Sequence, residues 1–103
     1  MFDLKQIQKM QQELQTRMAK LQEELKTQTV EAASGGGMVT AIANGNQELI
    51  GMKIKPDAVD LDDLEMLEDL VVAAVNQAME KAKALNNDQM SQLTGGINIP
   101  GLF

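Results

Sequence analysis

The side chains of this chain that could take part in chemistry are carboxylates, lysines, one arginine and hydroxyls, because its 103 residues include neither histidine nor cysteine. Histidine is the commonest general base and transition-metal ligand, and cysteine supplies thiolates for catalysis, zinc sites and disulfides. Without them no motif identifies a reaction. We therefore expect a protein that is not an enzyme, holds no metal or cofactor and takes no small-molecule substrate.

The densest group of carboxylates could in principle bind calcium. It lacks the alternating acids, glycine and distal glutamate of a calcium-binding loop. Acids also suit the N-terminal end of a helix, where Asp57 or Asp60 can cap free amides. We interpret the group as a capped helix start, formed by Asp57, Asp60, Asp62, Asp63, Glu65, Glu68 and Asp69.

Three consecutive glycines, at positions 35–37, would suit a phosphate-binding loop only in the right context. Such a loop follows a buried strand, leads into a helix and usually supplies a lysine. Here the glycines lead into a strand-like run, and the next lysine is Lys53. The glycines are predicted to form a turn between two strands.

The cations are concentrated near the N-terminus. The net charge is −6, but residues 1–34 balance five cations against five acids, whereas residues 61–103 have two lysines against seven acids. The N-terminal third is therefore the better surface for a polyanion. No secretory signal or membrane-spanning run is recognisable, so we expect a cytoplasmic protein without membrane contact.

The first predicted element is a long helix over residues 1–27, which carries most of these cations. Apolar residues recur along it at steps of about three and four, which is typical of a heptad seam, and Asp3 is a plausible N-cap. The helix can pack along its own sheet, or it can project and pair with another helix. If it pairs, the predicted dimerisation residues are Leu14, Met18 and Leu21.

Residues 29–54 are predicted to form a small sheet of three strands. The runs 29–34, 38–43 and 48–54 have β character, and Asn44-Gly45-Asn46 between the last two is a strong hairpin signal, because Asn and Gly tolerate positive φ. Gly51 could mark a bulge that brings Leu49 into phase with the rest of its strand.

The remaining chain is predicted to be helical over residues 61–93, with a tail over 94–103. The small, apolar middle of this helix can approach a sheet closely. Asn86, Asn87 and Asp88 can break the helix after Leu85. The tail can be a frayed terminus or can dock in an apolar groove. The predicted core stripe consists of Leu64, Leu67, Val71, Ala74, Ala78 and Leu85.

Taken together, these segments closely resemble the YbaB/EbfC family of small bacterial nucleoid-associated proteins. The resemblance covers nearly the whole chain. It rests on the glutamine- and lysine-rich first helix, "VEAASGGGMVTAIANGNQELIGMKIKP", "LEMLEDLVVAAVNQAMEKA" and "LTGGINIPGLF". It implies a single α+β domain with a long N-terminal helix, a three-stranded antiparallel sheet and a C-terminal helix, assembled as a dimer shaped like tweezers.

The resemblance also implies that the protein binds double-stranded DNA as a homodimer, with little sequence preference, alters its conformation and sits on the nucleoid. Lysine and arginine would then contact phosphates, and the acidic net charge predicts weak, salt-sensitive binding. The candidate DNA-binding residues are Lys5, Lys9, Arg17, Lys20, Lys26, Lys81 and Lys83.

A protein-interaction adaptor or holdase is the alternative function. Long helices bearing methionine and leucine can grip apolar segments of a partner. The acidic balance suits this function better than it suits DNA binding.

Overall fold

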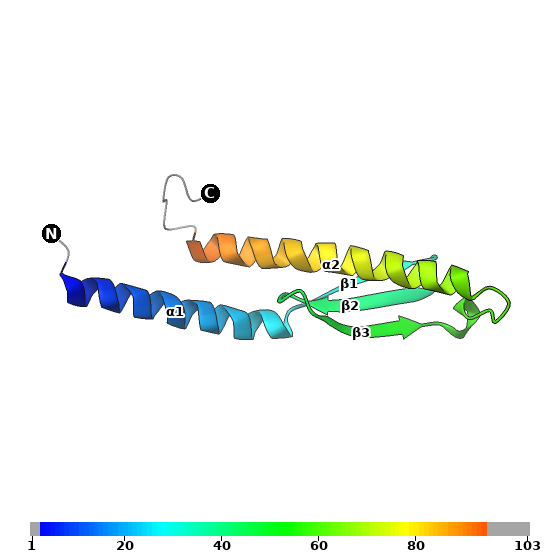
Figure 1. Ribbon diagram of the computed structural model, residues 1–103, viewed down its shortest axis with the longest axis horizontal. Coiled ribbons are helices and arrows are strands. Elements are labelled where there is room, and N and C mark those ends of the chain that lie inside the picture. The colour runs from blue at the N-terminus through cyan, green and yellow to red at the C-terminus, as the bar shows by residue number, and fades with distance from the viewer. Residues whose placement is uncertain (1–2, 95–103) are drawn as a thin grey trace.

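The computed structural model describes residues 3–94, and side-chain positions up to Leu93. The chain forms two long helices and one three-stranded sheet, which confirms the predicted α+β class (Figure 1). The predicted tail lies outside the described residues, apart from Thr94, which ends the second helix. In order, the elements are α1 (Leu4–Thr27), β1 (Thr29–Ser34), β2 (Val39–Asn44), β3 (Leu49–Ile54), η1 (Pro56–Ala58) and α2 (Leu64–Thr94).

Helix α1 begins at its predicted cap and projects beyond the sheet. The Asp3 carboxylate accepts a hydrogen bond from the Lys5 N–H at 3.3 Å. Of its apolar seam, only Leu21 and Leu25 are buried, at 8% and 1% exposure, because only the C-terminal end of α1 reaches the rest of the protomer (Figure 1). Leu4 at the other end is 74% exposed. Of the two arrangements predicted for α1, the protomer has the projecting one.

The sheet is antiparallel with strand order β1-β2-β3. The three glycines make the first turn, all with positive φ, which residues with a Cβ rarely adopt. The bulge is confirmed: Ile42 pairs with Gly51 and Ala43 with Leu49, so Ile50 is the extra residue. The second turn is where it was predicted, but its positive φ falls on Gln47 rather than on an asparagine or glycine.

Helix α2 begins later and ends later than the run 61–85 predicted for its main part. Asp63 is the cap, since its carboxylate accepts from the Met66 N–H at 3.2 Å, while Asp60 accepts from the Asp62 N–H at 3.0 Å in the preceding turn. The predicted break at 86–88 is wrong. The helix continues because the Asn86 amide donates to the Gly45 carbonyl, at 2.9 Å, instead of competing for the helix backbone.

The core lies between α2 and one face of the sheet and consists largely of small side chains. Ala74, Ala78 and Ala82 follow one another at steps of four and are fully buried. They pack against buried alanines of β1 and β2 and against Val39. Small residues on both surfaces let the helix approach the sheet closely. Of the predicted stripe, Leu64 is exposed at the start of α2, and Ala82 takes a core position that the prediction omitted.

Candidate nucleic-acid interface

Helix α1 brings four of the seven predicted cations onto one broad face. At about 100° per residue, Lys5, Lys9, Arg17 and Lys20 fall within an arc of roughly 120°. The apolar seam lies on the other side of the helix, where Leu21 and Leu25 contact the protomer. All four cations are exposed. The seam therefore orients α1, and the orientation leaves these cations facing solvent.

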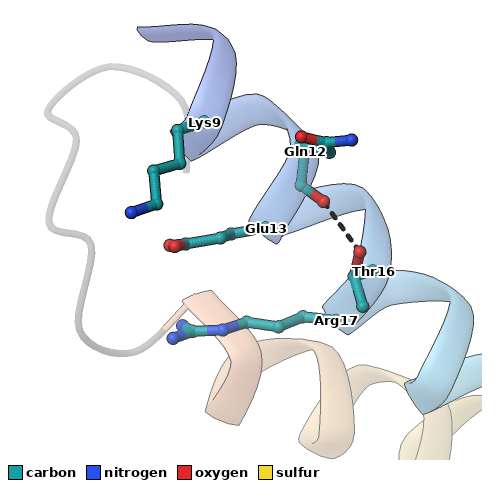
Figure 2. Close-up of a pocket in the computed structure, with 5 residues that line it drawn as sticks. All are labelled: Lys9, Gln12, Glu13, Thr16 and Arg17. Carbon is teal, nitrogen blue, oxygen red and sulfur yellow. Dashed lines mark hydrogen bonds between the residues drawn. The ribbon is translucent and has the colours of Figure 1, made fainter. Parts of the chain in front are cut away.

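Figure 2 shows the middle of this face, where Lys9, Glu13 and Arg17 project to the same side of α1. With Gln12 and Thr16 they line an open depression of about 400 Å³. The Thr16 hydroxyl donates to the Gln12 backbone carbonyl at 2.9 Å, so this hydroxyl is already paired within α1. The depression is therefore lined by two cations with one carboxylate between them.

A second depression, of about 270 Å³, lies where the end of α2 meets α1. Arg17 lines both depressions, so its guanidinium lies at the junction of the two helices. Amides of α2 add neutral donors and acceptors beside the cations. The lining residues are Arg17, Lys20, Leu21, Glu24, Gln89, Gln92 and Leu93.

The other three predicted cations lie off this face, Lys26 in the last turn of α1 and Lys81 and Lys83 on α2. Lys26 is near Glu23, with 3.9 Å between the ammonium nitrogen and a carboxylate oxygen. Lys81 donates to the Glu31 carbonyl of edge strand β1 at 2.8 Å, which ties α2 to the sheet. Lys83 is exposed two residues further on, about 200° around α2 from Lys81. As contacts for DNA, all seven cations stay predictions, and Lys5, Lys9, Arg17 and Lys20 are the four that share one face of α1.

The three predicted dimerisation residues have different surroundings within the protomer. Leu14 is 41% exposed, Met18 is half-buried, and Leu21 is buried against the protomer itself. Only Leu14 of these therefore offers a large free surface to a second chain. The pairing of α1 with a second copy stays a prediction.

Sequence analysis missed the junction that fixes the direction of α1. The Gly45 N–H donates to the Leu25 and Gln28 carbonyls, both at 2.9 Å. The Asn46 amide donates to the Gln22 carbonyl at 3.0 Å, and Asn86 of α2 donates to Gly45. The β2–β3 turn thus binds the last turns of α1 to α2 (Figure 1). Asn44-Gly45-Asn46 could have indicated this role only if its amides had been expected to bond outside the turn.

The buried Asn44 side chain holds this turn in shape. Its carbonyl oxygen accepts from the Asn46 N–H at 3.0 Å and the Glu48 N–H at 3.1 Å, and its amide donates to the Glu48 carboxylate at 3.1 Å. A buried amide is stable only when its donors and acceptors are paired, and here they are. The turn is therefore a well-defined support for the cation-bearing helix.

Exposed large apolar side chains form two groups in the described part of the chain. One lies on the projecting half of α1 and consists of Leu4, Ile7, Met10 and Leu14. The other, which we call the β3–α2 apolar group, comprises exposed residues of edge strand β3, of the segment between η1 and α2, and of the N-terminal part of α2. It consists of Leu49, Ile50, Ile54, Val59, Leu61, Leu64, Met66 and Val72.

The projecting helix with its row of cations and the small-residue core define an α+β protein with a surface suited to contact with a polyanion. Comparison with known families matches residues 1–97 to the YbaB/EbfC DNA-binding family. The match spans nearly the whole chain, so the chain belongs to this family. No helix in residues 3–94 has both the length and the apolar character needed to cross a membrane.

Individual relatives agree with this assignment. A nucleoid-associated protein of Thermoanaerobacter pseudethanolicus is 53% identical over 102 residues, covering 99% of this chain and 92% of its own. One of Pelotomaculum thermopropionicum is 50% identical over 100 residues, covering 97% and 91%. The crystal structure of an uncharacterized protein of Helicobacter pylori matches with a TM-score of 0.76 at 23% identity, over 95% of this chain and all of that one. That structural match concerns the fold alone.

Proposed function

We propose that this protein is a nucleoid-associated protein that binds double-stranded DNA as a homodimer, with little sequence preference, and alters the conformation of the duplex. The observation that carries the proposal is the row of exposed cations along one face of projecting α1, in a chain whose net charge is −6. Family membership and the names of the relatives support DNA as the partner and the nucleoid as the location.

The mechanism rests on phosphate contacts. Lysine and arginine side chains that neutralise phosphates release counterions from the duplex, and this supplies most of non-specific affinity. Lys5, Lys9, Arg17 and Lys20 offer a few such contacts per protomer. The acidic remainder of the chain reduces long-range attraction, so binding is weak and sensitive to salt.

Low sequence preference follows from what α1 presents. Base pairs are distinguished by side chains that reach base edges in the grooves, whereas phosphate contacts only position a protein. The four cations spread over a broad arc rather than converging as a recognition element does. With two projecting helices, a dimer contacts the duplex at two places and can hold it bent. No catalytic step is part of the proposal.

In this proposal the second copy packs on the β3–α2 apolar group. β3 is an edge strand, and no element of residues 3–94 pairs with its free side. Contiguous exposed apolar patches on soluble proteins often mark sites of protein–protein interaction. Pairing there leaves both α1 helices free to reach DNA, whereas pairing through the α1 seam would bring the two cation rows together.

The test is a fluorescence-anisotropy titration of a labelled duplex of about 30 base pairs at salt concentrations from roughly 25 to 200 mM. The logarithm of the binding constant should fall linearly with the logarithm of the salt concentration, by about 0.9 per phosphate contact. Lys9→Ala and Arg17→Ala should each reduce that slope by about 0.9 for each α1 helix that contacts the duplex.

Lys53→Ala is the matched control, since Lys53 is an exposed lysine on β3. It removes the same charge without touching α1 and should leave the slope unchanged. Absence of binding at 25 mM would contradict DNA binding. Equal effects of Lys9→Ala and Lys53→Ala would instead contradict α1 as the contact surface.

A further inference from the structure

Glu13 is the one acid within the arc that the α1 cations occupy between Lys9 and Lys20. It lies four residues after Lys9 and four before Arg17, a spacing that places the three side chains on the same face of a helix. In Figure 2 its carboxylate lies between the ends of the two cations and points into the same depression.

Glu13 is close to both cations without being tied to either. Among residues 3–93, the ion pair within 4.0 Å is that of Lys26 with Glu23, not one made by Glu13. A solvated carboxylate between two solvated cations lowers the positive potential of both. A DNA phosphate held by Lys9 and Arg17 would therefore lie beside a fixed negative charge.

We propose that Glu13 limits the affinity of this site for DNA. It reduces the charge of the Lys9–Glu13–Arg17 group from +2 to +1, so that the two cations together neutralise about one phosphate. The inference rests on the proposed function and concerns the strength of the same contact. The consequence is a dimer that holds DNA loosely and exchanges readily between positions, since affinity changes within one interface act mainly on the dissociation rate.

The variant that tests this role is Glu13→Gln, which keeps the size and shape of the side chain and replaces the charged carboxylate with a neutral amide. We expect binding about three- to tenfold tighter at 25 mM salt, with a salt slope steeper by about 0.9 for each α1 helix that contacts the duplex. Stopped-flow dissociation should become slower by a similar factor.

Glu68→Gln is the matched control. Glu68 is exposed near the start of α2, at the end of the molecule opposite the projecting half of α1 (Figure 1). Its loss makes the same change in net charge, so any effect that it shares with Glu13→Gln is a general charge effect. The triple variant Lys9→Ala/Glu13→Gln/Arg17→Ala, compared with Lys9→Ala/Arg17→Ala, adds a second readout, because the gain from Glu13→Gln should largely disappear when both of its neighbouring cations are absent.

The outcomes separate the two proposals. If the wild-type protein binds and Glu13→Gln matches Glu68→Gln in affinity and slope, the role of Glu13 is wrong and DNA binding stands. Weaker binding by Glu13→Gln also overturns it, since Glu13 would then support the contact. If neither wild type nor Glu13→Gln binds at 25 mM, both proposals fail. Circular dichroism melting curves of both variants distinguish these results from loss of helix.

Discussion

Gly45 is the residue at which the junction between α1 and the sheet has least room. A Cβ placed there would lie 2.5 Å from a Leu25 methyl carbon and 3.1 Å from both the Leu25 Cβ and its carbonyl oxygen. Leu25 is 1% exposed, so it has little space to move away. The requirement for glycine at this position is therefore one of space, since its φ is not in the left-handed region.

Gly45→Ala should lower the free energy of unfolding by about 1 to 3 kcal/mol, the usual range for overpacking a filled site. Urea unfolding followed by circular dichroism measures the change. Gly51→Ala is the control, because its Cβ would make ordinary contacts, 3.4 Å or more from Ile42. Equal losses in the two variants would show that the close approach to Leu25 is not what requires glycine.

For single residues, the sequence was enough to predict which side chains carry charge or cap a helix. It was not enough to predict which residues they contact across the fold. The cations could be grouped by helical spacing, and the caps by residue type. Asn86 could not be assigned, because an asparagine within a helical run has the same local character whether it breaks the helix or bonds elsewhere. Its partner, the Gly45 carbonyl, is 41 residues away in sequence.

At the scale of elements, the contact of α2 with the sheet depends on alanine. Ala78 is in the middle of the buried row and has 0% exposure. Ala78→Leu adds three carbons where the helix already touches the sheet, so it should destabilise the fold by about 1 to 3 kcal/mol. Thermal and urea unfolding would show the loss.

Ala84→Leu is the control on the same helix, at an exposed position. Leucine and alanine are both good helix formers, so this change should cost little. If Ala84→Leu were as destabilising as Ala78→Leu, helix propensity or solubility would explain both, and the close packing of α2 on the sheet would not.

Element type and order were predictable because each long segment has a clear period: about 3.6 in the helices and alternation in the strands. The ends of α2 were less predictable. The helix begins at 64 rather than at the predicted 61, because the Asp63 N–H donates to the Asp60 carbonyl at 3.0 Å in a separate turn. The cap is therefore Asp63 and not Asp57 or Asp60, the two residues that were predicted. Such choices among neighbouring aspartates depend on backbone geometry that residue types do not specify.

The whole protomer is elongated, with principal extents of 72 × 25 × 16 Å and a radius of gyration of 19.7 Å. A compact domain of this length would have a radius of gyration of about 13 Å. The projecting half of α1 accounts for much of the difference and contributes little to the core (Figure 1). A protomer of this shape leaves apolar surface exposed, and burial against a second copy would stabilise it.

A second copy can cover either of two exposed apolar surfaces, and one substitution on each surface distinguishes them. Ile54, 43% exposed on β3, belongs to the β3–α2 apolar group, and Leu14, 41% exposed, belongs to the α1 seam. Ile54→Glu should convert the protein from dimer to monomer, because a carboxylate buried at an apolar interface is unpaired and costly. Leu14→Glu should leave the dimer intact. Size-exclusion chromatography with light scattering, over a range of protein concentrations, measures the mass of both variants.

The two substitutions form a matched pair, since each introduces one negative charge at an apolar side chain of similar exposure. Loss of the dimer in Leu14→Glu alone would place the interface on α1, as the heptad seam first indicated, and would put the cation rows of the two copies side by side. Loss of the dimer in Ile54→Glu alone would place the interface on the β3–α2 apolar group and leave the two α1 helices separate from each other. In that case the Ile54→Glu monomer should retain about half the salt slope of the dimer on the same duplex, because it carries one α1 rather than two.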